Sequence, residues 1–261
     1  MEMRVTHIGT ATVLFEIGDL RIVTDPAFDP AGTHYSWALF GGNSTKLEEP
    51  ARAAADLGRV DAMLITHAQH DDNLDPSGIA LLPAAGRVIT TKPSARRLGG
   101  KAEGLAEWQS TELVSPSGLR VRITATPARH GPPLSLPFVG KVIGFVLEWT
   151  GQEHGAVYIS GDTVLFAGVE EVARRFRVGT ALLHMGEAKL PITGPFRLTM
   201  NGEQGAAAAK LLGAKTIIPV HYDGWTHFSE PRAKAVRAFE AAGIADRVRW
   251  VPKGTAVSLA V

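Results

Sequence analysis

Short apolar runs separated by polar turns are the dominant pattern along this chain. Runs of this length that are rich in Val, Ile, Leu and Thr are typical of β-strands. We predict strands at residues 5–8, 12–17, 20–24, 62–66, 87–90, 119–126, 143–149, 156–160, 181–184, 216–220 and 248–251. Helical patterns lie between several of these runs, and this alternation indicates a mixed α/β fold.

Helix signals are clearest near the C-terminus. Asn201 followed by Gln204 is a capping-box arrangement, and Gly213 can end the helix that continues over 206–212. Ser229 can cap a second helix with Pro231 in its first turn. Further helices are predicted at residues 50–57, 76–82, 94–98 and 166–176.

Composition narrows the chemistry that is available. Among 261 residues, 45% are hydrophobic and 20% charged, as in ordinary globular proteins, and the net charge of +1 gives no field that would attract nucleic acid. The chain has no cysteine, so any metal must be held by His, Asp, Glu, Asn or the backbone. No run reaches the roughly 20 apolar residues of a membrane span. The N-terminus also lacks the apolar stretch of a signal peptide, so we expect a cytoplasmic protein without membrane insertion.

Metal-binding side chains gather in one loop, directly after the apolar run 62–65. The loop carries His67, His70, Asp71 and Asp72 within six residues. Imidazole and carboxylate together suit zinc, manganese or iron, and such a cluster is seldom structural.

Four more candidates follow other apolar runs: His130, Asp162, His184 and His221. In sheet proteins, side chains at the ends of neighbouring strands converge on one edge, where ligands usually bind. A single histidine after a strand is more often an ordinary residue, and Asp162 could simply cap a helix. Their recurrence at five strand ends, with His67, predicts a common site.

The order of several motifs resembles metallo-β-lactamase-fold hydrolases, in the branch that includes ascorbate-6-phosphate lactonase and N-acyl-phosphatidylethanolamine phospholipase D. The motifs are HIGTATVL at 7–14, TDP at 24–26, the loop 66–75, SGDT at 160–163, the segment 196–200 and IPVHY at 218–222. Together they span nearly the whole chain. The resemblance implies a four-layer αββα sandwich, formed as a single domain over residues 1–261, with one or two metal ions in a cleft at one edge.

The resemblance also implies a ligand set. The first metal site of the family has three histidines, matched here by His67, His70 and His130. The second site uses an aspartate and a histidine of the loop, a bridging aspartate and a final histidine. Asp72, Asp162 and His221 match three of these positions, and Asn73 stands in place of the loop histidine.

The loop departs from the family spacing by one residue. Counting forward from His67 puts Gln69 at the second histidine position, whereas counting backward from Asn73 puts His70 there. We favour His70, together with Asp72, because imidazole is a much better ligand than an amide. The amide of Asn73 is also a weak metal ligand, so we predict one tightly bound ion and a second ion that is weakly bound or absent. Zn²⁺ is the first choice, with Mn²⁺ and Fe²⁺ as alternatives.

This set predicts hydrolysis of a small ester, lactone or phosphodiester by a metal-activated water. Asp72 or Asp162 would orient the water and take its proton, or would act only as ligands. His184 would donate a proton to the leaving group or would pack in the core. Contacts to the substrate or to the metal ligands are expected from His7, Asp25, Gln69, Asn73, Trp225 and His227. His7 is expected near Asp25.

The remaining expectations concern the substrate and the competing functions. The aromatic segments 34–40 and 222–228 are expected to wall a pocket for an apolar or sugar-like substrate, or else to pack the sandwich edges. Arg197 and Lys189 are single candidates for a phosphate contact. The alternatives are a metal-binding or regulatory protein that has lost catalysis and a nuclease, against which the near-neutral charge argues. The partner is a small molecule, and a homo-oligomer stays open.

Overall fold

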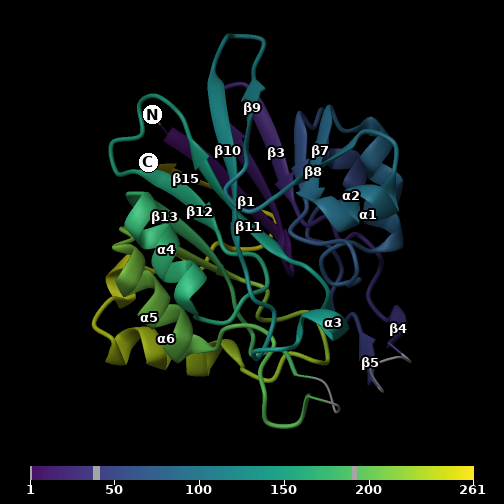
Figure 1. Ribbon diagram of the computed structural model, residues 1–261, viewed down its shortest axis with the longest axis vertical. Helices are drawn as coiled ribbons and strands as arrows, with labels where there is room; N and C mark the ends of the chain where they lie inside the picture. The colour runs from purple at the N-terminus through teal and green to yellow at the C-terminus, as the bar shows by residue number, and fades with distance from the viewer. Residues whose placement is uncertain (1, 38–41, 190–192) are drawn as a thin grey trace.

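Two β-sheets face each other at the centre of the protein, and helices cover their outer faces (Figure 1). The computed structural model describes residues 2–37, 42–189 and 193–261. The first sheet has the order β15 (Ala256–Ala260), β1 (Glu2–Gly9), β2 (Thr12–Ile17), β3 (Leu20–Thr24), β6 (Ala62–Leu64), β7 (Arg87–Thr91) and β8 (Ala102–Leu105). The second has the order β14 (Thr216–Val220), β13 (Val178–His184), β12 (Ala156–Ile159), β11 (Ile143–Glu148), β10 (Arg120–Pro127) and β9 (Ser110–Val114). β4 (His34–Trp37) and β5 (Gly42–Thr45) form a separate hairpin.

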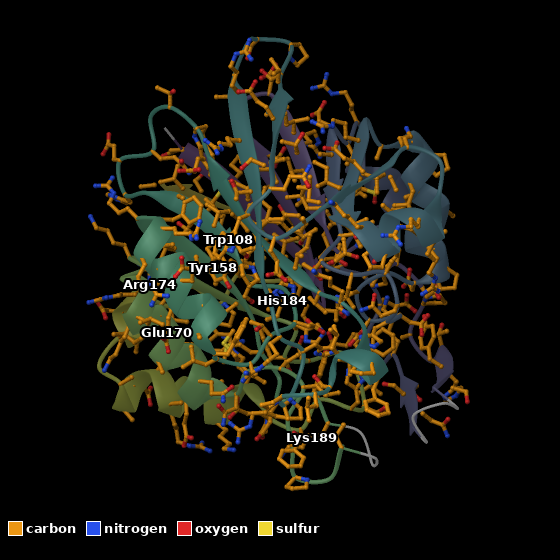
Figure 2. All side chains as sticks on the ribbon, in the orientation of Figure 1. Trp108, Tyr158, Glu170, Arg174, His184 and Lys189 are labelled. Atoms are coloured by element: carbon orange, nitrogen blue, oxygen red, sulfur yellow. The ribbon has the colours of Figure 1, made fainter. Side chains whose placement is uncertain are left out.

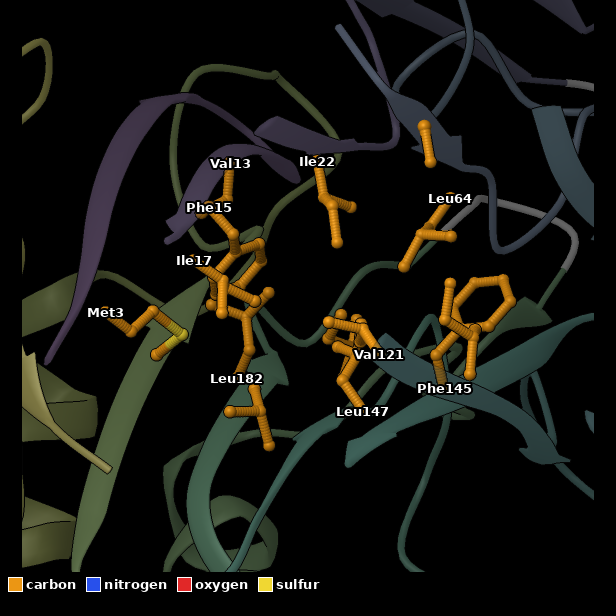
Figure 3. Close-up of a cluster of buried hydrophobic side chains, with 14 of the residues drawn as sticks. Met3, Val13, Phe15, Ile17, Ile22, Leu64, Val121, Phe145, Leu147 and Leu182 are labelled. Atoms are coloured by element: carbon orange, nitrogen blue, oxygen red, sulfur yellow. The ribbon is translucent and has the colours of Figure 1, made fainter. Parts of the chain in front are cut away.

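The main core lies between the two sheets, as Figure 3 shows. Alternate residues of β2, Val13 and Phe15 among them, point into this layer, where they meet Phe145 and Leu182 of the second sheet. Leu14, between them in sequence, packs on the opposite face. Because both faces of this strand are buried, its successive residues are apolar, and this short apolar run is the pattern that predicted the strand.

Helices form the two outer layers of the sandwich. α1 (Pro76–Leu81) and α2 (Lys92–Leu98) lie beside the first sheet, while α4 (Ala167–Arg175), α5 (Gly202–Leu212) and α6 (Arg232–Ala241) cover the second (Figure 1). A short helix, α3 (Leu136–Val139), follows β10 in the chain. The predicted αββα sandwich is therefore confirmed. None of the helices in the described part of the chain is long and apolar enough to cross a membrane.

One edge of the sandwich collects the candidate residues. In the first sheet β3, β6 and β7 are parallel, and in the second β12, β13 and β14 are parallel. Asp25 follows β3, Asp162 follows β12, and His221 follows β14, while His184 ends β13. The carboxyl ends of parallel strands meet at the same edge, so the chain brings these distant residues together.

Capping of the C-terminal helices was predicted correctly for α5 and wrongly for α6. The side chain of Asn201 caps α5 by accepting from the Gln204 N–H, and Gly213 ends this helix in the left-handed conformation. Ser229 does not cap α6, because its hydroxyl donates to the carbonyl of Glu187, and Pro231 takes the cap position instead.

Other predicted elements differ from the structure where hydrogen bonds to distant segments determine the backbone conformation. Residues 248–251 form a single bridge with Ile217 rather than a strand. The helix expected at 50–57 is reduced to a 3₁₀ turn, Ala54–Leu57, because the N–H of Ala51 pairs with Ile8 instead. Segment 34–37, expected to be irregular, is strand β4, and residues 38–41 lie outside the described part.

Candidate metal centre

Three histidines from distant parts of the chain form the first cluster. His67 and His70 come from the loop after β6, and His130 comes from the segment after β10. The Nδ1 atom of His70 lies 3.0 Å from Nε2 of His67 and 3.3 Å from Nε2 of His130. The three ligand atoms lie within 4.8 Å of one another, close enough to share one ion.

The outer ring nitrogens of this cluster are held by the scaffold. His130 donates from Nδ1 to the carbonyl of Leu198 over 2.9 Å. Thr66 gives its hydroxyl proton to Asp25, so the Nδ1–H of His67 donates to Thr66 Oγ1 over 2.9 Å. Each Nε2 therefore presents a lone pair to the cluster, as a metal ligand requires.

Burial and the neighbouring histidines favour the neutral form of two of these imidazoles, His67 and His70. Burial, together with repulsion from His130, lowers the pKa of His70 to about 3. Burial and its histidine neighbours likewise hold the pKa of His67 well below its usual value. At neutral pH His67 and His70 consequently offer nitrogen lone pairs rather than protons.

Two carboxylates and a histidine form the second cluster. Asp72, Asp162 and His221 bring their ligand atoms within 4.8 Å of one another. His221 Nε2 lies 3.2 Å from Asp72 Oδ2 and 3.5 Å from Asp162 Oδ2. Burial opposes the charged form of His221, but these carboxylates outweigh it and raise its pKa to about 9. Protonated His221 thus supplies positive charge beside the two carboxylates, as a bound cation would.

Asp162 stands between the two clusters. Its Oδ2 lies 3.9 Å from Nε2 of His67 and 3.8 Å from Nε2 of His130, in addition to the contact with His221. Both of its oxygens are buried and lack a hydrogen-bond partner among the described residues. A buried carboxylate without hydrogen bonds is costly unless positive charge lies close to it, and here His221 is the neighbour that can carry such a charge. The donor set and the missing hydrogen bonds of this carboxylate therefore fit a cation that Asp162 would help to hold.

A glycine turn fixes Asp162 in this place. Gly161 has a φ of 61°, and a Cβ there would lie 2.6 Å from the carbonyl oxygen of Ile143. Only glycine fits this turn without strain. β12 can thus end abruptly and direct the next side chain into the centre.

Of the two candidates for the second histidine position of the loop, His70 faces the first cluster and Gln69 does not. Gln69 turns away, and its amide donates to the carbonyls of Val139 and Lys141 over 2.9 and 3.2 Å. The structure thus brings His70, and not Gln69, to His67. Asp75 fixes the other end of the loop by capping α1.

The amide nitrogen of Asn73 supports Thr66, while its Oδ1 has no hydrogen-bond partner among the described residues. The residue is buried, and its amide donates to Thr66 Oγ1 over 3.4 Å. Asn73 also hydrogen-bonds Asp25, whose pKa burial raises to about 8. Its position supports the Thr66–Asp25 pair.

His184 does not face a substrate. It is fully buried near the centre of the molecule, where Figure 2 labels it. Its Nε2 lies 3.3 Å from Asp25 Oδ2 and its Nδ1 3.3 Å from Ser160 Oγ. Of the two predicted roles, these partners favour packing in the core over proton donation to a leaving group, because the ring is enclosed by Asp25 and Ser160.

The outer candidates have packing or bracing roles. His7 Nε2 donates to the carbonyl of Thr10 over 3.0 Å, and that carbonyl also accepts from the His221 N–H. His7 had been expected near Asp25, but through Thr10 it braces His221 instead. Trp225 is 2% exposed and donates to Thr10 Oγ1, so it packs the edge and does not line an open pocket. The environment of Trp37 lies outside what the structure describes.

The expected phosphate contacts are already paired. Arg197 and Lys189 each lie 3.3 Å from the carboxylate of Glu187, and Figure 2 shows Lys189 at the lower end of the molecule. Sequence reasoning also missed Thr66 and Ser44, whose hydroxyls lie 2.9 Å from Nδ1 of His67 and 2.6 Å from Nδ1 of His227. Thr66 precedes a metal-loop histidine, which could have indicated its role, whereas nothing near Ser44 in the sequence indicates one.

Comparisons with known proteins identify the family. The chain is 28% identical over 265 residues to a UPF0173 metal-dependent hydrolase of Pelotomaculum thermopropionicum, covering 98% of this chain and all of that one. A possible metal-dependent hydrolase from Veillonella parvula shares the fold with a TM-score of 0.83 and 21% identity, covering 99% and 100% of the two chains. An isothiocyanate hydrolase from Delia radicum gut bacteria also shares the fold, with a TM-score of 0.82 and 20% identity, covering 99% of this chain and 100% of that one. The family model described as the beta-lactamase superfamily domain matches residues 20–222, most of the chain, and the protein accordingly belongs to this family and has the metallo-β-lactamase fold.

Proposed function

We propose that this protein is a metal-dependent hydrolase that cleaves a small ester, lactone or phosphodiester. The observation that carries this proposal is Asp162, a buried carboxylate whose oxygens both lack a hydrogen-bond partner among the described residues, set between two groups of ligand atoms. Relatives named metal-dependent hydrolases along nearly the full chain support the reaction class. The motif resemblance to a lactonase and a phospholipase D supports lactone and phosphodiester substrates within it.

The chain's own residues would hold the metal and orient the reactants. His67, His70 and His130 would bind the first ion, and the second cluster would bind a second ion with Asp162 shared. A metal ion in such a site lowers the pKa of a water molecule toward 7 and polarises the bond to be cleaved. The imidazole-rich first cluster favours Zn²⁺, and the two carboxylates of the second leave Mn²⁺ and Fe²⁺ as alternatives.

Carboxylates would handle the water proton. Hydrogen bonds from His221 and His227 outweigh burial and hold the pKa of Asp72 well below its usual range, which makes Asp72 a ligand and a weak base. Asp162 borders both clusters, so it is the better placed of the two to orient the attacking water.

The surface next to His130 supports an apolar group on the substrate. Leu134, Leu136 and Phe138 are 89%, 60% and 63% exposed in the segment that follows this ligand. A cavity of about 300 Å³ between this segment and Phe166 is lined by His130 and Leu136. Apolar side chains kept in water beside a reactive centre are typical of a binding surface.

Metal content and hydrolysis measured together test the proposal. Metal-loaded protein is assayed on p-nitrophenyl esters of increasing chain length, on lactones and on bis-p-nitrophenyl phosphate. We expect activity on at least one class, and loss of both activity and metal in the His67→Ala/His130→Ala double variant. His154→Ala, a substitution of a histidine far from the centre that contacts Lys215, is the matched control. Equal rates for the wild type and the double variant on every substrate would refute the proposal.

A further inference from the structure

The second cluster lacks one imidazole compared with the family pattern, because Asn73 replaces the loop histidine. Asn73 is a poor substitute for it, since its amide nitrogen donates to Thr66 and its Oδ1, although buried without a hydrogen-bond partner among the described residues, is a weaker ligand than imidazole. Another histidine, His227, reaches the same cluster from the loop after β14. Its Nε2 lies 3.0 Å from Asp72 Oδ2, slightly closer than the 3.2 Å that separates His221 Nε2 from the same oxygen.

From this geometry we propose that His227 is the fourth protein ligand of the second metal site, completing the set of Asp72, Asp162 and His221. This inference rests on the proposed metal centre. Two ligand atoms bound to one ion at about 2.1 Å lie roughly 3–3.5 Å apart. The separation between His227 and Asp72 falls within that range, and the side chain of His227 is only 5% exposed.

The far nitrogen of His227 is held in the same way as those of the other histidines. Its Nδ1 lies 2.6 Å from the hydroxyl of Ser44, a buried residue of β5. Thr66 and the Leu198 carbonyl hold Nδ1 of His67 and His130 similarly. Ser44 can accept from the Nδ1–H while its own proton goes to Thr226 Oγ1, 3.4 Å away. In this tautomer Nε2 of His227 presents its lone pair to an ion held by Asp72, whereas without an ion the same atom can donate a hydrogen bond to that carboxylate.

The β4–β5 hairpin fixes this arrangement in place. Thr45 donates its N–H to Thr226 Oγ1 over 3.0 Å and accepts the Thr226 N–H at 3.1 Å. The ring of Phe228 packs 4.4 Å from the ring of His227. His227 is therefore positioned before any ion arrives, which is what a high-affinity ligand needs.

Two metal sites follow, one with three histidines and one with two histidines and two aspartates. From Asn73 alone, the second ion was predicted to be weakly bound or absent. With His227 as a ligand, we expect the second ion to bind with ordinary affinity. His227 supplies the imidazole from the opposite end of the chain, so the loop can use an asparagine to brace Thr66 instead.

Metal counting on a set of variants tests this inference. Metal-stripped wild type, His227→Ala, His227→Gln, Ser44→Ala and His154→Ala are loaded with Zn²⁺ or Mn²⁺, dialysed and analysed by elemental mass spectrometry. We expect two ions per chain in the wild type and in His154→Ala, and one in both His227 variants. Glutamine keeps an N–H that can donate to Asp72, so loss of the ion in His227→Gln separates ligation from hydrogen bonding. Ser44→Ala should keep two ions, the second bound about 10–100-fold more weakly.

The outcomes separate this inference from the proposal beneath it. Two ions retained with wild-type affinity in His227→Gln, or a wild type that binds a single ion, would overturn the role of His227 and leave the first site standing. A wild type that binds no ion would overturn the metal centre itself. Circular dichroism of each metal-free variant establishes that it folds. If the His227 variants do not fold, X-ray absorption of the loaded wild type decides, because the inference requires five imidazoles over the two ions, three from the first cluster and two from His221 and His227, and four would contradict it.

Discussion

Replacing Thr66 with valine should weaken the metal centre without touching a ligand. The hydroxyl accepts from His67 Nδ1 over 2.9 Å and donates to Asp25 over 3.0 Å, and all three side chains are fully buried. Thr66→Val keeps the shape but leaves the imidazole N–H without an acceptor. Stranding a buried polar group costs about 1–3 kcal/mol. We therefore expect the metal-free protein to lose about that much stability. Metal affinity should fall about 10–100-fold, since the orientation of His67 is no longer fixed.

The strand β7 offers a matched control. Thr90 is also fully buried, but its hydroxyl has no hydrogen-bond partner among the described residues. Thr90→Val should therefore leave stability unchanged or slightly raised, and should leave metal affinity at the wild-type value. Urea unfolding in the presence of a chelator measures the first quantity, and competition with a chromophoric chelator measures the second.

Equal metal affinity in Thr66→Val and Thr90→Val would refute the positioning role of Thr66. Equal losses in both variants would show that any hydroxyl removed from this sheet disturbs the site, which would equally contradict a specific link to His67. A loss confined to Thr66→Val, in affinity as well as in stability, is the result that the hydrogen-bond geometry requires.

Three further predictions concern single residues. His70→Ala should lose an ion per chain by elemental analysis, whereas Gln69→Ala should retain it, and the reverse result would restore the other alignment of the loop. Gly161→Ala should destabilise the metal-free protein by about 2 kcal/mol or more in urea unfolding, because a Cβ meets the Ile143 carbonyl at 2.6 Å and the φ of 61° disfavours alanine. Burial lowers the pKa of His7 to about 4, so the unfolded chain binds a proton first as the pH falls. Wild type should lose up to about 3 kcal/mol of stability from this histidine between pH 6.5 and 4, and a His7→Gln variant with an equally steep pH profile would contradict this.

Strand positions and strand-end ligands could be predicted because both depend on local pattern. Burial of β2 on both faces requires a short apolar run, so Val13, Leu14 and Phe15 already indicate a strand. His130 and His221 could be singled out because polar side chains directly after apolar runs fall at a sheet edge. β15 was missed; it is an edge strand with one of its five residues buried, and its place is set by pairing with β1, which lies far away in the sequence.

The bracing residues could not be predicted because they depend on contacts between distant segments. Ser44 lies 183 positions before His227, and no local pattern joins a hairpin serine to a loop histidine. Asn73 was judged by its weakness as a ligand, whereas its contact with Thr66 gives it a different role. His184 could not be separated from a catalytic group, because the enclosure of its ring by Asp25 and Ser160 exists only once three strands have assembled.

Backbone strain at the same edge indicates that the centre is set by the fold before metal binds. Thr10, Asp25 and His221 have φ values of 49°, 37° and 58°, in a region that costs a non-glycine residue about 1–3 kcal/mol. Hydrogen bonds hold each of them: the Thr10 carbonyl accepts from His221, and Asp25 accepts from Thr66. Such conformations persist only where the surroundings enforce them, here the packed core between the two sheets. A metal ion would thus meet side chains already in place, and its binding free energy would not be spent on folding the site.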